Sequence, residues 1–139
     1  MKLRTTLIAA LLMILGACPV LAREPAAPAT IAAEQLIARM LAGEEDKEVK
    51  VHVYTFPPGA ATPWHIHPDA HEVAYVVEGD FTFQFAGEEP KRLQPGEAEY
   101  LPPNIVHRGM NEGGEPVRLF VVRIKPKDKP LVEEVPAPQ

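Results

Sequence analysis

The stretch that decides the fold spans residues 59–79 and reads GAATPWHIHPDAHEVAYVVEG, with histidines at positions 65, 67 and 71 and a glutamate at position 72. Two histidines separated by one residue on an extended segment project from the same face, because side chains alternate along a strand. The sequence Pro-Asp-Ala at 68–70 is typical of a turn, so we expect the chain to fold back and bring Glu72 opposite His67. The spacing predicts a metal site with three ligands from one hairpin.

A second stretch, residues 96–111, reads GEAEYLPPNIVHRGMN and supplies a fourth candidate ligand, His107. The first stretch resembles the first cupin motif, G-x5-H-x-H-x4-E-x6-G, at every specified position. The second resembles the second cupin motif, G-x5-P-x-G-x2-H-x3-N, except that Asn104 stands at the second glycine. Asparagine tolerates the left-handed backbone conformation better than most residues, so we expect the turn to be kept. The resemblance covers residues 48–125.

The resemblance to cupins implies a fold and a ligand set. It implies an all-β chain with a single jelly-roll β-barrel, in which His65, His67, Glu72 and His107 bind one divalent metal. Three imidazoles and one carboxylate suit transition metals and are too rich in nitrogen for calcium or magnesium. We expect iron or manganese, with nickel, cobalt or zinc as alternatives, and no other cofactor. Four protein ligands leave open positions for a substrate or dioxygen on a six-coordinate metal.

The glutamate position has one competitor. A shift of the strand register by one residue would point His71 inward in place of Glu72, because such a shift exchanges the two faces of the strand. The motif spacing favours Glu72. A fifth histidine, His52, lies far from both motifs and is expected on the surface of a strand.

Length and charge limit the function classes. The chain has 139 residues, sixteen prolines and a formal net charge of −5, which suits one small domain. The only clustered lysines lie at residues 125–129, so the basic surface that nucleic-acid binding requires is missing from the sequence. We expect a small-molecule substrate or ligand and no nucleic-acid partner.

The N-terminus reads as a targeting segment. Lys2 and Arg4 precede an apolar run over residues 7–15 that is too short to span a bilayer, and small residues near Ala22 suit a cleavage site. We expect a signal peptide at 1–22 and a periplasmic or secreted protein. In the alternative interpretation, residues 15–18 resemble a lipobox and Cys18 carries a lipid anchor; a retained N-terminal anchor is a third alternative. We expect no membrane span.

The remaining chain divides into three parts. Residues 23–47 are expected to form a linker and a short N-terminal helix over 31–42, with Thr30 as its cap and Gly43 as its stop. The barrel follows at 48–125, and a proline-rich C-terminal tail occupies 126–139. Alternating apolar residues and turn signals predict strands at 49–55, 73–77, 81–85, 91–93, 98–101, 106–109 and 117–124. Glu78-Gly79-Asp80 predicts a hairpin between the second and third of these.

The motifs do not specify a reaction, because one fold supports many functions. Resemblance to small cupin dioxygenases favours a metal-dependent oxidoreductase acting on a small oxygen-bearing organic substrate, with Glu72 as ligand and proton acceptor. The alternatives are a non-enzymatic metal or small-molecule binding protein and a metal-assisted lyase or isomerase. We also expect a homodimer, with the helix or the first strand at the interface, because a small barrel leaves edges to be covered.

Overall fold

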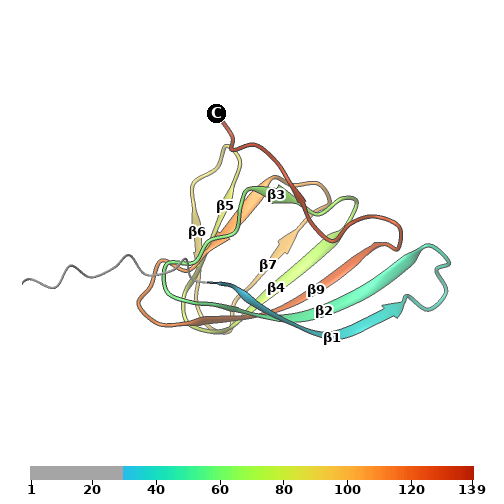
Figure 1. The fold of residues 1–139 in the computed structure, drawn as a ribbon, viewed down its shortest axis with the longest axis horizontal. Helices are drawn as coiled ribbons and strands as arrows, with labels where there is room; N and C mark the ends of the chain where they lie inside the picture. Colours follow the sequence, from blue (N-terminus) through green and yellow to red (C-terminus); the bar gives the residue numbers. More distant parts are fainter. Residues whose placement is uncertain (1–29) are drawn as a thin grey trace, which may run out of the picture.

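The structure is a computed structural model that describes residues 30–139. Apolar and polar residues alternate along two long strands, which belong to the first of its two sheets. This sheet contains, in spatial order, β1 (Ala32–Met40), β2 (Lys47–Phe56), β9 (Val117–Pro126), β4 (His71–Glu78) and β7 (Ala98–Leu101). The facing sheet contains β10 (Glu133–Glu134), β3 (His65–Ile66), β8 (His107–Met110), β5 (Phe81–Phe85) and β6 (Lys91–Leu93). The two antiparallel sheets close around one interior (Figure 1). The expected all-β jelly-roll is confirmed.

Each of the seven predicted strand segments begins and ends within two residues of the ends of an observed strand. The predicted signal peptide at 1–22, the lipidation of Cys18 and the first part of the linker lie outside the described residues. Within residues 30–139 the structure contains no helix that is long and apolar enough to cross a membrane.

The predicted helix over residues 31–42 is wrong. Residues 32–40 form β1, which pairs antiparallel with β2 from Ala32 opposite Thr55 to Met40 opposite Glu48. Almost all of β1 is exposed, so a helix here would have had little apolar surface to hold it. A helix of this length is marginal by itself, whereas the free edge of β2 offers a row of unpaired backbone groups.

The two predicted hairpins are also wrong, although the turns exist. β3 and β4 belong to different sheets, and so do β4 and β5. Gly79, with φ of +74°, makes the tight connection between β4 and β5, where a Cβ atom would lie 2.8 Å from Cγ2 of Val117. Each turn therefore carries the chain across the barrel, and strand signals alone do not distinguish this crossing from a hairpin.

Phenylalanines from β5 fill the interior. Phe81, Phe83 and Phe85 are buried and pack with Phe56 and leucine, valine and alanine side chains of the facing sheet. Gly109 on β8 lies against this cluster, and a Cβ atom there would be 2.4 Å from Cζ of Phe81. The missing side chain lets an aromatic ring sit directly on the strand that carries His107.

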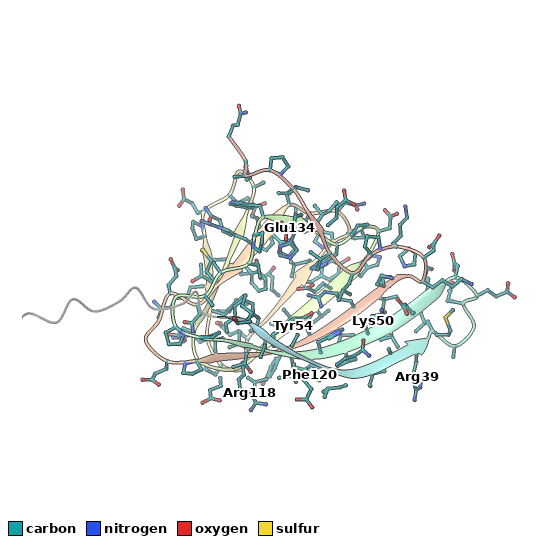
Figure 2. All side chains as sticks on the ribbon, viewed as in Figure 1. Arg39, Lys50, Tyr54, Arg118, Phe120 and Glu134 are labelled. Carbon is teal, nitrogen blue, oxygen red and sulfur yellow. The ribbon has the colours of Figure 1, made fainter. Side chains whose placement is uncertain are left out.

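The opposite face of the first sheet is apolar as well. Val73 and Tyr75 of β4, Phe120 of β9 and Tyr100 of β7 are between 36% and 53% exposed. Val73 lies opposite Tyr100, and Tyr75 lies opposite Phe120, so the four side chains are neighbours. In Figure 2, Arg118 and Phe120 of β9 point away from the barrel interior. We call these four residues and Val77, which is 44% exposed, the outer apolar face.

Candidate metal centre

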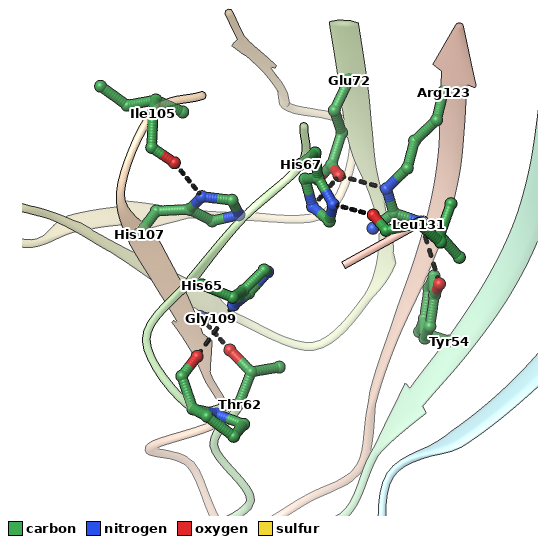
Figure 3. Close-up of polar contacts among 11 residues, drawn as sticks. Tyr54, Thr62, His65, His67, Glu72, Ile105, His107, Gly109, Arg123 and Leu131 are labelled. Carbon is green, nitrogen blue, oxygen red and sulfur yellow. Dashed lines mark hydrogen bonds and ion pairs between the residues drawn. The ribbon is translucent and has the colours of Figure 1, made fainter. Parts of the chain in front are cut away.

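Three histidines converge inside the barrel. His65 on β3 lies directly opposite His107 on β8, and their ring centroids are 4.2 Å apart. His67, just past the end of β3, places its ring 5.0 Å from that of His65 and 5.2 Å from that of His107. All three are at least 93% buried, and one ring nitrogen of each lies within 4.8 Å of the others. Figure 3 shows the three rings facing a common space.

Backbone carbonyls fix the protonation of these rings. The Nδ1 atoms of His65, His67 and His107 lie 2.8, 2.6 and 2.9 Å from the carbonyl oxygens of Pro63, Leu131 and Ile105. A carbonyl oxygen only accepts, so each Nδ1 is the donor, and Nε2 is the ring nitrogen left to face a metal. This is the arrangement in which histidine binds a metal through Nε2.

Glu72 approaches the histidines from the facing sheet. Its Oε2 atom lies 2.8 Å from Nε2 of His67 and receives a hydrogen bond of 2.5 Å from Nε of Arg123. Nε2 of His67 makes no hydrogen bond with the part of the chain that the structure describes. Two ligand atoms 90° apart on a metal, each bonded at about 2.1 Å, lie about 3 Å from each other. The donor set therefore fits a divalent metal, and the assignment of Glu72 as fourth ligand stays a prediction.

The interior shifts the acidity of these groups toward the metal-binding forms. Burial raises the pKa of Glu72, but the charge of Arg123 and the close approach of His67, 2.8 Å from the carboxylate, outweigh it and lower that pKa to about 2. Burial and the neighbouring His65 lower the pKa of His107 to about 4. Burial also lowers the pKa of His65. At neutral pH the carboxylate is ionised, and His65 and His107 are neutral.

Arg123 is the main residue of the site that our sequence analysis missed. It pairs directly with Glu72 across β9 and β4, and its Nη1 donates a hydrogen bond of 2.9 Å to the hydroxyl of Tyr54. Arg123 points to the inner side of β9, as do Val117, Leu119 and Val121 at every second position before it. A charged residue at an inward position of an apolar strand was therefore the available signal.

A cavity of about 150 Å³ joins these groups. The histidines 65 and 107, Glu72 and Arg123 line one part of it, and aromatic and aliphatic side chains line the rest: Phe56, Phe81, Phe83, Leu119 and Val121. Ile31, Val132 and Glu134 contribute from the two ends of the described chain. The site is thus a small and largely apolar pocket with its polar groups gathered together.

Asn104, which departs from the second cupin motif, ties two loops together. Its φ is +63°, as the expected left-handed turn requires. Its side-chain amide donates to the carboxylate of Asp69 at 3.0 Å, and the backbone NH of Asp69 donates back to the Asn104 side-chain oxygen at 3.0 Å. A glycine could not make either bond. The pair links the loop after His67 to the loop before His107.

The C-terminal tail reaches the site as well. We call residues 131–135 the C-terminal strap: β10 pairs with β3, and the backbone NH of Val135 donates to the carbonyl of Trp64 at 2.9 Å. Figure 1 shows the C-terminal segment, in red, running from the end of β9 back over the barrel. Through the carbonyl of Leu131, the strap orients His67 although the two residues are 64 positions apart.

The other two histidines do not join the centre. His71 is exposed, and its Nδ1 lies 2.7 Å from the hydroxyl of Tyr100. The sequence analysis placed His52 on the surface of a strand, and this prediction is wrong: the residue is 93% buried. It stacks on Tyr54, and its Nδ1 has no hydrogen-bond partner among the described residues.

Comparison with known proteins identifies the matching family and its relatives. The family model described as Cupin domain matches residues 52–123. An auxin-binding protein of Prunus persica is 34% identical over 67 residues, which are 45% of this chain and 32% of that protein. A germin-like protein of Morus alba is 31% identical over 68 residues, which are 46% and 32% of the two chains. The chain spans about a third of the length of these curated relatives.

Solved structures share the fold. A double-stranded beta-helix protein from Klebsiella pneumoniae has a TM-score of 0.60 and 21% identity, covering 77% of this chain and 85% of its own. The DMSP lyase DddQ from Ruegeria pomeroyi has 0.58 and 21%, covering 76% and 51%. An oxalate oxidase has 0.54 and 24%, covering 63% and 46%. At these identities the likeness extends to the fold alone.

The first prediction concerns the C-terminal strap. Removing residues 131–139 takes away the acceptor for Nδ1 of His67, so we expect metal affinity to fall about 10- to 100-fold, measured by competition with a chromophoric chelator. Removing only residues 136–139 leaves the strap in place and serves as the matched control. Equal affinity in the two truncated proteins would contradict the role of Leu131.

The second prediction concerns pH. The unfolded chain binds more protons than the folded one between the folded pKa of His107, about 4, and its ordinary value of 6.5. The contribution of His107 to the stability of the metal-free protein is therefore fully present above about pH 6.5 and is lost as the pH falls toward 4. The contribution of Glu72 is lost below about pH 4.5, as the pH falls toward 2. Thermal melting should show a lower Tm at about pH 5 than at about pH 7.5.

A His107→Gln variant should lose part of this pH dependence, whereas His71→Ala, on the surface, should keep it. A Tm that rises as the pH falls from neutral would contradict the assignment.

Proposed function

Because the chain belongs to the cupin family, we propose that it is an exported enzyme that uses one divalent transition metal to oxidise a small oxygen-bearing organic molecule. The observation that supports the metal is the convergence of three buried histidine rings, each oriented by a backbone carbonyl at its Nδ1 atom. Iron or manganese suits the oxidation, and nickel, cobalt and zinc suit the same donors. The likeness to an oxalate oxidase, which is limited to the fold, is compatible with this proposal.

His65, His67 and His107 would hold the metal, with Glu72 beside His67 as the fourth candidate ligand. When bound, the metal would supply a Lewis acid and a redox centre within the cavity. The phenylalanines of β5 keep the site apolar, which strengthens electrostatic interactions inside it. Glu72, with a pKa of about 2 and a bond to Arg123, is a weak base, so we withdraw its role as proton acceptor.

The lack of a free base supports a second candidate, a non-catalytic small-molecule binding protein. Among the residues that line the cavity, the carboxylate of Glu72 is already paired with Arg123, and Glu134 is exposed. A metal-assisted lyase or isomerase would need such a base as well. Oxygen consumption by the iron- or manganese-loaded protein, tested over a panel of small organic acids and alcohols, separates an oxygen-dependent oxidoreductase from both.

The third prediction tests the metal centre. His107→Ala removes one of three converging donors, so the metal content of the purified protein should fall by about tenfold or more, measured by elemental analysis. His71→Ala removes a histidine from the surface and should leave the metal content unchanged. Loss of metal in both variants, or in neither, would show that the converging histidines are not the binding site.

We further propose export to the periplasm or outside the cell, supported by the positive residues and short apolar run at the N-terminus. The intact mass of the protein from its own host separates two outcomes. A chain beginning at Arg23 indicates ordinary signal cleavage, and a chain beginning at a lipidated Cys18 indicates an anchor.

A homodimer is the fourth prediction, now with a different interface. The helix that we expected at the interface does not form, and the outer apolar face takes its place because it presents five neighbouring apolar side chains to solvent. Light scattering should give the mass of a dimer for the wild type. Tyr75→Glu places a charge in the centre of this face and should give a monomer.

The control is Val132→Glu, which changes an equally exposed apolar residue that lies on the C-terminal strap, away from the outer apolar face. A wild-type monomer at micromolar concentration would rule out the dimer.

A further inference from the structure

The barrel interior contains one buried ion pair beside the three histidines. Glu72 and Arg123 are both more than 90% buried, and they face each other as a direct cross-strand pair. The same Glu72 oxygen that accepts from Arg123 also lies 2.8 Å from Nε2 of His67. With a divalent metal on the three histidines, one carboxylate would serve both a metal ion and a guanidinium. The buried charges would then sum to a positive value.

Neighbouring charges do not remove this excess. Lys50, opposite Arg123 on β2, and Lys125 share a single carboxylate, that of Glu48, at 3.2 and 2.8 Å. Glu134 is the remaining acidic residue that lines the cavity, and it is exposed, so water and salt screen its charge. A buried positive excess is stabilised by an anion that enters the same cavity.

Arg123 has a donor available for such an anion. Its Nε atom donates to Glu72 and its Nη1 atom donates to Tyr54. Its Nη2 atom makes no hydrogen bond with residues 30–139, and Arg123 lines the cavity that also contains His65 and His107. A guanidinium held on two sides presents its remaining N–H groups in a fixed direction, which suits a carboxylate oxygen.

The rest of the cavity sets the size and character of the ligand. Its walls away from the charged groups are Phe56, Phe81, Phe83, Leu119 and Val121. A volume of about 150 Å³ holds a molecule about the size of benzene. A ligand that matches both parts has one charged end and a short apolar body.

We propose that the cavity takes a small monocarboxylate, with its carboxylate at Arg123 on the side of the metal centre and its apolar body against the phenylalanines. The inference rests on the proposed metal centre, because without a metal the charges of Glu72 and Arg123 balance. It adds a substrate class and a binding role for Arg123. It also gives a role to the arginine that follows the inward apolar residues of β9.

The test compares butanoate with butanamide, which have the same number of non-hydrogen atoms and differ in charge. Calorimetric titration of the zinc-loaded protein, with zinc content measured in the same sample, gives both dissociation constants. We expect butanoate to bind at least about tenfold more tightly, as a charge-assisted hydrogen bond would give. Zinc is chosen because it has no redox chemistry, so binding is measured without turnover.

Three variants locate the preference. Arg123→Met combined with Glu72→Gln removes the buried pair together and leaves no unpaired charge. Arg123→Lys keeps an ion pair with Glu72 but has a single nitrogen in place of the three of the guanidinium. The preference for butanoate should fall to about threefold or less in both. Arg118→Met removes a positive charge from the outward side of the same strand and should keep the full preference.

The outcomes separate the two proposals. Protein that binds no zinc overturns both the metal centre and the anion site. Protein that binds zinc but does not distinguish butanoate from butanamide overturns the substrate class alone. A preference that survives both changes at Arg123 would assign anion binding to the metal by itself and overturn the role of Arg123.

Discussion

The Nδ1–H group of each of the three buried histidines must donate a hydrogen bond to an acceptor, because a buried donor without a partner destabilises the fold. The acceptors are carbonyls of three different segments: the approach to β3, the turn before β8 and the C-terminal strap. These bonds set the ring orientations and leave the three Nε2 atoms to face a common space. The same three bonds thus hold the segments at the barrel mouth and create a place for a cation.

The second constraint is the ion pair between Glu72 and Arg123. Burying two charges in an apolar barrel is costly, and removing either partner would leave the other uncompensated. Tyr54 also stabilises the buried guanidinium. Its hydroxyl accepts a hydrogen bond from Nη1, and the centre of its ring lies 5.3 Å from the guanidinium carbon. The pair lies between the histidines and the rest of β9. It therefore links the candidate metal centre to the sheet that contains β4 and β9.

The two sheets contribute differently to the site. The sheet of β3, β5 and β8 supplies His65, His107 and the phenylalanines of β5, with His67 just past the end of β3. The sheet of β2, β4 and β9 supplies Glu72, Arg123 and Tyr54. The polar groups meet only because β4 and β9 face β3 and β8 across the interior (Figure 3). Asn104 and Asp69 then fix the distance between the two loops that carry His67 and His107. Metal-site geometry and barrel closure are therefore set by the same contacts.

The sequence by itself determined the all-β fold, the position of seven of the ten strands in residues 30–139 and the three histidines of the centre. Strand alternation and motif spacing are local properties, and the chain retains them when it folds. Only the tertiary structure decided which strands pair. The segment at 32–40 became a strand because β2 offered an edge, and the turns at Pro68 and Gly79 crossed between sheets instead of closing hairpins. Arg123, Tyr54 and Leu131 entered the site through contacts between residues far apart in sequence, which no local pattern encodes.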